Sequence, residues 1–138
     1  MEYNFFYTHL LLVPAITFAC TVLLKGIFVK FKTGKVDLSR SLGSGGMPSV
    51  HSSVVVSLAT AIAIKYGVNS DLFAMAMSFT VIIIYDAINV RFEAGQHAVA
   101  INASLGEKKF KESLGHLPSE AFAGSILGII SAVIIYYI

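Results

Sequence analysis

Long apolar runs separated by short polar segments dominate the pattern of this chain. Four runs approach the roughly 20 residues that a helix needs to cross a membrane. They extend from Leu10 to Phe28, Val50 to Tyr66, Leu72 to Val90 and Glu120 to Ile138. The second run is the shortest, and a short buried helix is the alternative for it. The pattern predicts an all-α integral membrane protein, a helical bundle of about four transmembrane helices.

A weaker periodic pattern occupies the segment Glu93 to Leu114, between the third and fourth runs. Apolar side chains recur there at near-helical spacing, at Ala94, Ala98, Ile101 and Leu105. This spacing is typical of an amphipathic helix lying at the membrane interface. A partly ordered loop is the alternative. Because no low-complexity linker interrupts the chain, we expect residues 1–138 to form one membrane-embedded domain.

Composition and charge support a membrane location and suggest an orientation. Of the 138 residues, 56% are hydrophobic and only 13% are charged, and the net charge of +2 is too small to indicate nucleic-acid binding. Nearly all Lys and Arg residues lie in the loops after the first and third runs. The positive-inside rule places both loops in the cytoplasm and both termini outside, as in a bacterial inner (plasma) membrane. A basic cytoplasmic face fits anionic lipid head groups.

Two short segments, Gly46–Ser52 and Gly115–Glu120, each combine Pro-Ser with a nearby histidine at the start of an apolar run. The start of a helix offers free backbone N–H groups and a positive dipole end, which together bind anions. A histidine beside such a site can act as a nucleophile or transfer a proton. The predicted topology places His51 and His116 on one membrane face, so the two segments can form a single site.

Other residues at the same predicted depth extend this picture. Asp86 and Arg91 end the third run on the face that carries both histidines, and ionisable groups at membrane depth are usually functional. The alternative is that Asp86 only pairs with Arg91 to hold the helix end. Gly124 and Gly128 form a Gly-x-x-x-Gly pattern in the fourth run. This pattern indicates close helix packing and is compatible with a homodimer.

Several of these residues fall in motifs that resemble a known family. The sequence contains Gly-Gly-Met-Pro-Ser-Val-His-Ser, then Tyr-Asp-Ala with Val-Arg and Ala-Gly, and finally Leu-Gly-His followed by a glutamate, at residues 45–52, 85–95 and 114–120. This arrangement resembles the divergent type-2 phosphatidic acid phosphatase family, small membrane proteins related to lipid phosphatases and vanadium haloperoxidases. The resemblance covers roughly residues 25–130.

The resemblance implies a reaction and roles for three residues. It implies an integral-membrane phosphatase that hydrolyses a phosphate monoester or pyrophosphate of a phospholipid or prenyl lipid. His116 would attack phosphorus, oriented by Glu120, and His51 would protonate the leaving alkoxide. The resulting phosphohistidine chemistry requires no metal and no other cofactor.

The resemblance also implies a set of phosphate-binding residues. Lys35, or Lys32 in its place, would act with Arg40. Related phosphatases carry a Ser-Arg pair before the attacking histidine, and this chain has none before His116. Lys109 and Lys111 are the nearest cations. Arg91 from the third run is the alternative for the missing arginine, with Asp86 in support. The full predicted phosphate-binding set is Lys35, Arg40, Gly46, Ser49, Ser52 and Arg91.

Two other functions fit the same residues. A non-catalytic protein that binds or transports lipid phosphates would keep the anion site without turnover. Alternatively, His51, His116, Glu120 and Asp86 could bind a divalent metal ion, since imidazole and carboxylate groups are common metal ligands.

Overall fold

A computed structural model describes residues 3–34 and 45–138, and the regular structure of these residues is entirely helical. This confirms the predicted all-α class. In chain order the elements are α1 (Phe5–Thr8), α2 (Leu12–Thr33), α4 (Val50–Tyr66), α5 (Asp71–Tyr85), the π-helical turn η1 (Asp86–Val90), α6 (Arg91–Leu105) and α7 (Pro118–Tyr137).

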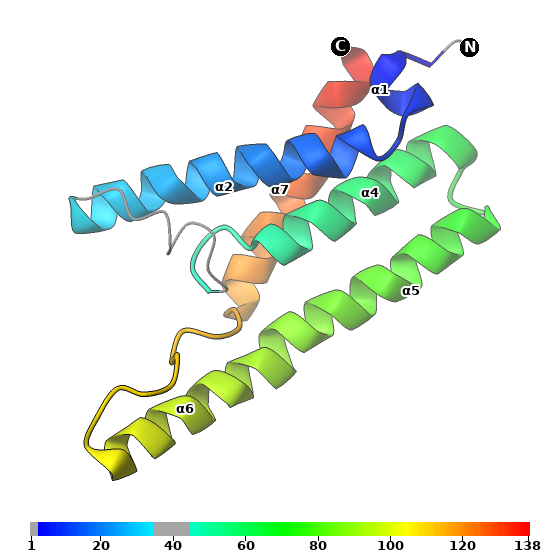
Figure 1. Ribbon diagram of the computed structural model, residues 1–138. Coiled ribbons are helices and arrows are strands. Elements are labelled where there is room, and N and C mark those ends of the chain that lie inside the picture. Colours follow the sequence, from blue (N-terminus) through cyan, green and yellow to red (C-terminus); the bar gives the residue numbers. More distant parts are fainter. Residues whose placement is uncertain (1–2, 35–44) are drawn as a thin grey trace.

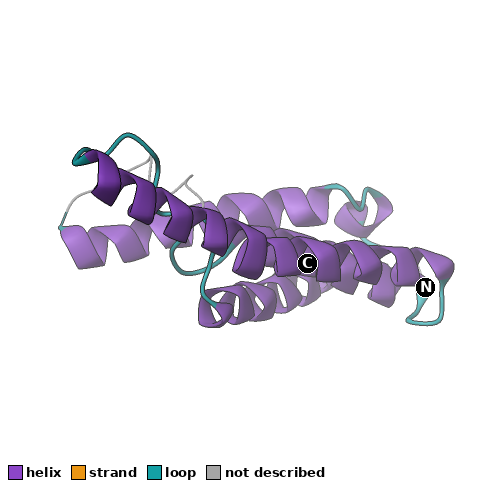
Figure 2. Ribbon diagram, turned by 90° about the horizontal axis from the view of Figure 1, so that it is seen from below, coloured by secondary structure: helices purple, strands orange, loops and turns teal. Residues whose placement is uncertain are grey.

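The helices form a bundle with α4 at its centre (Figure 1). Helix α4 packs against α2 on one side, α5 on the other and, most extensively, α7. Helices α5 and α6 continue one another through η1 as a single long rod, which Figure 2 shows from below. The two termini lie together at one end of the bundle, and the starts of α4 and α7 lie toward the other.

Within the described residues, three helices are long and apolar enough to cross a membrane: Leu12–Phe31, the continuous helix Asp71–Leu105, and Pro118–Tyr137. The fourth apolar helix, Val50–Tyr66, has the bounds expected from the sequence but is shorter than a typical span. Since it packs between the other helices, we assign it to the same membrane-embedded bundle. The bundle therefore contains three full-length candidate spans and one short apolar helix.

The glycines of the fourth run pack within the chain. A Cβ atom at Gly128 would lie 2.5 Å from the carbonyl oxygen of Ser53, and one at Gly124 would clash with the carbonyl oxygen of Ser49. Only glycine allows α7 to approach α4 this closely, which confirms the packing expected for Gly-x-x-x-Gly. Because α4 already occupies this face, a homodimer would have to use another surface.

Hydroxyl groups join α2 to its neighbours inside the bundle. The Thr17 hydroxyl lies 2.7 Å from the Ser131 hydroxyl on α7, and the Thr21 hydroxyl lies 2.9 Å from the Ser53 hydroxyl on α4. Both threonines are fully buried. Hydrogen bonds of this kind hold membrane helices together where apolar packing alone gives little preference over lipid.

The segment predicted as an interfacial helix differs from expectation in its bounds and its buried face. Helix α6 continues the third span without a break and ends at Leu105, so residues 106–117 return to α7 as a non-helical segment. The buried side of α6 carries Gly95, Ala98 and Asn102, whereas Ile101 and Leu105 are exposed. This side of α6 faces the return segment, because Asn102 hydrogen-bonds to Phe110 through both its side-chain amide and its side-chain oxygen.

Candidate functional site

The start of α4 is fixed by Ser49. Its hydroxyl oxygen accepts a hydrogen bond from the Ser52 N–H at 3.3 Å and another from the Ser52 hydroxyl at 3.1 Å. The Ser49 N–H donates to the carbonyl of Glu120 at 3.1 Å, which ties the start of α4 to the first turn of α7. Both side chains are buried, with the Ser49 hydroxyl capping α4 and the Ser52 hydroxyl donating to it. That these two residues bind phosphate stays a prediction. His51 lies in the first turn of α4, so this cap also fixes the position of its backbone.

The start of α7 is organised by one carboxylate oxygen. Oε2 of Glu120 accepts the Leu117 N–H at 3.2 Å, which caps the helix, and it also contacts Nδ1 of His116 at 3.0 Å. Pro118 occupies the first helical position, where its missing N–H costs nothing. Glu120 therefore both caps the start of α7 and orients the His116 ring.

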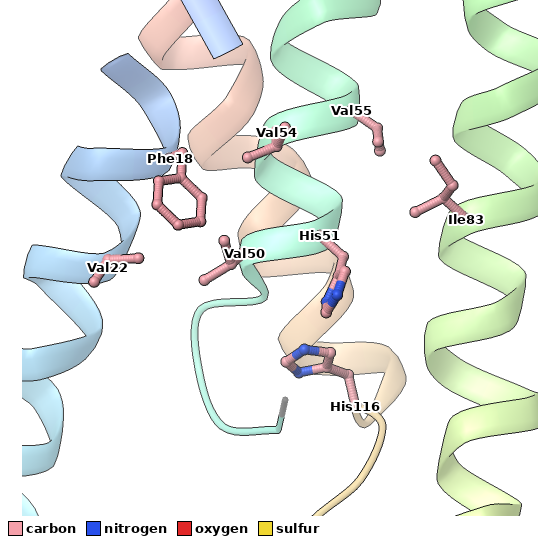
Figure 3. Close-up of a pocket in the computed structure, with 8 residues that line it drawn as sticks. All are labelled: Phe18, Val22, Val50, His51, Val54, Val55, Ile83 and His116. Carbon is pink, nitrogen blue, oxygen red and sulfur yellow. The ribbon is translucent and has the colours of Figure 1, made fainter. Parts of the chain in front are cut away.

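The two histidines meet in the interior of the molecule (Figure 3). Their ring centroids are 5.8 Å apart with an interplanar angle of 67°, and His116 is only 1% exposed. In the described part of the chain, Nε2 of His116 and Nδ1 of His51 are buried and have no hydrogen-bond partner of regular geometry, although the backbone of Gly46 lies near enough to His116 to raise the pKa of the ring. An ionised carboxylate can only accept, so Nδ1 of His116 donates to Glu120 and Nε2 keeps its lone pair. This is the form that a nucleophilic imidazole requires.

The environment of His116 favours the neutral ring. Burial lowers the pKa of His116 below its usual value, and the hydrogen bond to Glu120 offsets part of this effect. A lowered pKa keeps the imidazole unprotonated at neutral pH, so that its nitrogen lone pair is available.

A buried lysine that the sequence analysis did not select lies beside the histidines. Lys25 of α2 is 2% exposed and interacts electrostatically with Glu120 and with both rings. Its Cε atom lies 3.5 Å from where a Cβ of Gly46 would be. The signal was present in the sequence, because Lys25 falls inside the first apolar run, where a cation is expensive unless it has a function.

Arg91 approaches the site from the other side. Its Nε lies 2.6 Å from Oδ2 of Asp86, so the predicted pairing of these two residues is present. Both side chains also interact electrostatically with His51. Because the ion pair uses Nε, the remaining guanidinium nitrogens of Arg91 are those that could meet an anion near His51.

Other predicted phosphate-binding residues can be placed only in part. Gly46 is exposed, has a φ of 84° and lies between Lys25 and His116. Lys35, Arg40 and the side chain of Lys32 lie outside the described residues. Over residues 3–34 and 45–138, no three His, Cys, Asp or Glu side chains gather closely enough to hold a metal ion. The geometry therefore gives the metal alternative no support.

A cavity of about 290 Å³ adjoins the histidine pair (Figure 3). Apart from the two rings, its walls are entirely apolar and come from α2, α4 and α5. The lining residues are Phe18, Val22, Val50, His51, Val54, Val55, Ile83 and His116. Such a space suits hydrocarbon, and the two histidine rings form part of its wall.

Comparison with known proteins identifies the family of this chain. The family model for the divergent PAP2 family matches residues 6–131, nearly the whole chain. The chain belongs to the divergent PAP2 family. Among curated proteins, the uncharacterized membrane protein YuiD of Bacillus subtilis is similar, with 37% identity over an alignment that covers 75% of this chain and 78% of the relative. No solved structure matches. The family match confirms the predicted family, and the long apolar helices together with the similar membrane protein support a membrane location.

Proposed function

We propose that this protein is an integral-membrane phosphatase that hydrolyses a lipid phosphate through a phosphohistidine on His116. The observation that carries the proposal is the arrangement around its ring. Nδ1 contacts Glu120, Nε2 is buried with no hydrogen-bond partner among residues 3–34 and 45–138, and the ring lies beside that of His51. A merely structural buried histidine would be expected to have both ring nitrogens satisfied. Membership of the divergent PAP2 family agrees with a phosphatase-like activity.

The proposed reaction has two steps. In the first, the lone pair on Nε2 of His116 forms a bond to phosphorus while the bond from phosphorus to the lipid oxygen breaks. His51 gives its proton to that leaving oxygen, and the carboxylate of Glu120 stabilises the positive charge that develops on the phosphorylated ring. In the second step, water attacks the phosphohistidine, His51 takes the proton of the water, and inorganic phosphate leaves His116 free again.

Positive groups around the ring pair supply the charge stabilisation that phosphoryl transfer needs. In the proposal, Lys25 and Arg91 bind the non-bridging oxygens from opposite sides, and the backbone near Gly46 completes the cradle. The start of α4 adds its dipole. Lys35 and Arg40, which the sequence analysis assigns to the same role, remain proposed phosphate ligands.

The apolar cavity supports a lipid as the substrate. A space of about 290 Å³ is at the small end of the range for ligand sites, so it fits part of one hydrocarbon chain. With the chain between α2 and α5, the phosphate of a phospholipid or prenyl phosphate would reach the histidines. We further propose that this end of the bundle faces the cytoplasm, where basic loops are favoured. Labelling of a cysteine at position 108 but not at position 69 from outside intact cells would contradict that orientation.

Phosphate release by the purified protein tests the function. In mixed micelles we expect release from at least one of phosphatidic acid, phosphatidylglycerol phosphate and a prenyl pyrophosphate. His116→Ala should abolish it, whereas His97→Ala, which changes an exposed histidine on α6, should not. Unchanged turnover in His116→Ala would refute the nucleophile assignment. Saturable lipid binding without phosphate release would support the non-catalytic alternative instead.

A further inference from the structure

The π-helical turn η1 forms a backbone contact with the catalytic histidine. Within η1 the Arg91 N–H bonds to the carbonyl of Asp86, five residues earlier, instead of the four that an α-helix would use. The carbonyl of Ala87 in the same turn accepts the backbone N–H of His116 at 2.9 Å. Single π-helical turns inside α-helices occur frequently at functional sites. Here η1 contacts the end of the return segment, residues 106–117, at His116.

Gly115 makes this contact possible. Its φ is +78°, and a Cβ atom there would lie 2.6 Å from Cα of Phe92 and 2.7 Å from the carbonyl carbon of Arg91. Any side chain would therefore push the segment off the first turn of α6. Gly95 allows a second close approach, since its Cβ would lie 2.9 Å from the carbonyl oxygen of Leu114. Together these glycines let the segment that ends in His116 lie directly on the helix backbone.

The same turn also fixes Arg91. In a regular α-helix, residues five apart point about 140° away from each other, because each residue rotates the chain by about 100°. The π-helical spacing instead brings Asp86 and Arg91 to one face, where Nε and Oδ2 are 2.6 Å apart. One turn thus holds the backbone of His116 through Ala87 and the side chain of Arg91 through Asp86.

We propose that η1 and Gly115 form a positioning element that sets His116 and Arg91 in register with each other. This inference rests on the proposed function, because the register matters where a nucleophile and an anion-binding arginine act on one phosphate. Gly115 and Ala87 touch no reacting atom, and they act only through His116. Misplacement of a reacting group by about 1 Å can cost about 100-fold in rate.

The matched pair Gly115→Ala and Gly106→Ala tests the element. Both glycines have a positive φ, 78° and 71°, so both variants carry similar backbone strain, but only Gly115 has atoms in the way of a Cβ. For Gly115→Ala we expect kcat on phosphatidic acid to fall by about 100-fold, with KM changing by less than about threefold. Gly106→Ala should keep at least about half of wild-type kcat. Equal losses in the two variants would overturn the proposal.

A second readout needs no turnover. Nitrogen NMR of the ring should show His116 protonated at Nδ1 in the wild type and in Gly106→Ala, and a mixture of both tautomers in Gly115→Ala, because Glu120 no longer meets Nδ1. An unchanged tautomer in Gly115→Ala would contradict the positioning role. If the wild type shows this tautomer but hydrolyses no lipid phosphate, the proposed function fails while the positioning stands.

Amide hydrogen exchange covers the case in which Gly115→Ala does not fold. In the unmodified protein the His116 N–H, bonded to the Ala87 carbonyl, should exchange at least about 100-fold more slowly than that of exposed Lys108. Equal exchange rates would mean that the return segment is not docked on η1, and the proposal would be wrong.

Discussion

Replacing Glu120 by glutamine separates the charge of this side chain from its geometry. A single oxygen, Oε2, meets both His116 Nδ1 and the Leu117 N–H, at 3.0 and 3.2 Å. The carbonyl oxygen of a glutamine can take the same place and accept both hydrogen bonds. Glu120→Gln should therefore preserve the helix cap and the Nδ1-protonated tautomer, and remove only the negative charge beside the ring.

The size of the effect follows from the strength of these bonds. Hydrogen bonds to charged groups contribute about 1.5–3 kcal/mol and neutral ones about 0.5–1.5 kcal/mol, so losing the charge costs about 1–1.5 kcal/mol once the ring turns positive. This corresponds to a fall in kcat of about tenfold. Glu120→Ala also leaves His116 Nδ1 and the Leu117 N–H without partners. It should reduce kcat by more than about 100-fold and weaken the cap of α7 by about 1 kcal/mol.

Steady-state phosphate release from phosphatidic acid, measured with the thermal midpoint in the same detergent, decides between these outcomes. Glu107→Gln makes the same chemical change at an exposed position and should leave both quantities unchanged. If Glu120→Gln is as damaging as Glu120→Ala, the shared-oxygen argument is wrong. If neither variant changes kcat, Glu120 does not orient the nucleophile.

Two further predictions concern charge. Lys25→Met should lower kcat/KM by about 10- to 100-fold through the loss of one charged hydrogen bond to phosphate, whereas Lys30→Met, at an exposed position, should leave kcat/KM unchanged. Equal losses of kcat/KM in both variants would exclude a specific role for Lys25. Because burial lowers the pKa of His116 below the unfolded value of about 6.5, the folded state binds fewer protons, and stability should fall as pH decreases below about 6.5. His116→Gln should reduce this dependence, and equal dependence in both proteins would contradict it.

Periodicity and length predicted the helices well, because apolar runs in a membrane have few alternatives to a helix. The bounds of α4 match the prediction from Val50 to Tyr66. The continuation of the third span into α6 was not predicted, since η1 carries no sequence signal that distinguishes it from an α-helical turn. The buried face of α6 was also missed, because a non-helical return segment covers it and hydrophobic periodicity does not report such contacts.

The candidate site was predicted in its centre and missed in part of its surroundings. The two Pro-Ser segments correctly indicated that His51 and His116 come together, and Glu120 was expected beside His116. Lys25 was missed because the positive charges were used only to orient the chain. Its position within the first apolar run was not considered. Ser49 and Ser52 were assigned to phosphate binding, which stays a prediction, and the cap that Ser49 forms at the start of α4 was not included.

The serines that line α4 bear on how the protein is made. Ser52, Ser53 and Ser57 are fully buried in the finished bundle, where α7 lies against the same helix. During synthesis, however, α4 emerges before α7, so the backbone at Ser53 and Ser57 does not yet have Gly128 against it, although the serine hydroxyls already bond within α4 and its cap. A short helix with such a polar stripe is poorly suited to wait in lipid on its own. We therefore expect α7 to stabilise α4 in the membrane once it is made, and a chain that stops before Pro118 to be recognised by cellular quality control as unfinished.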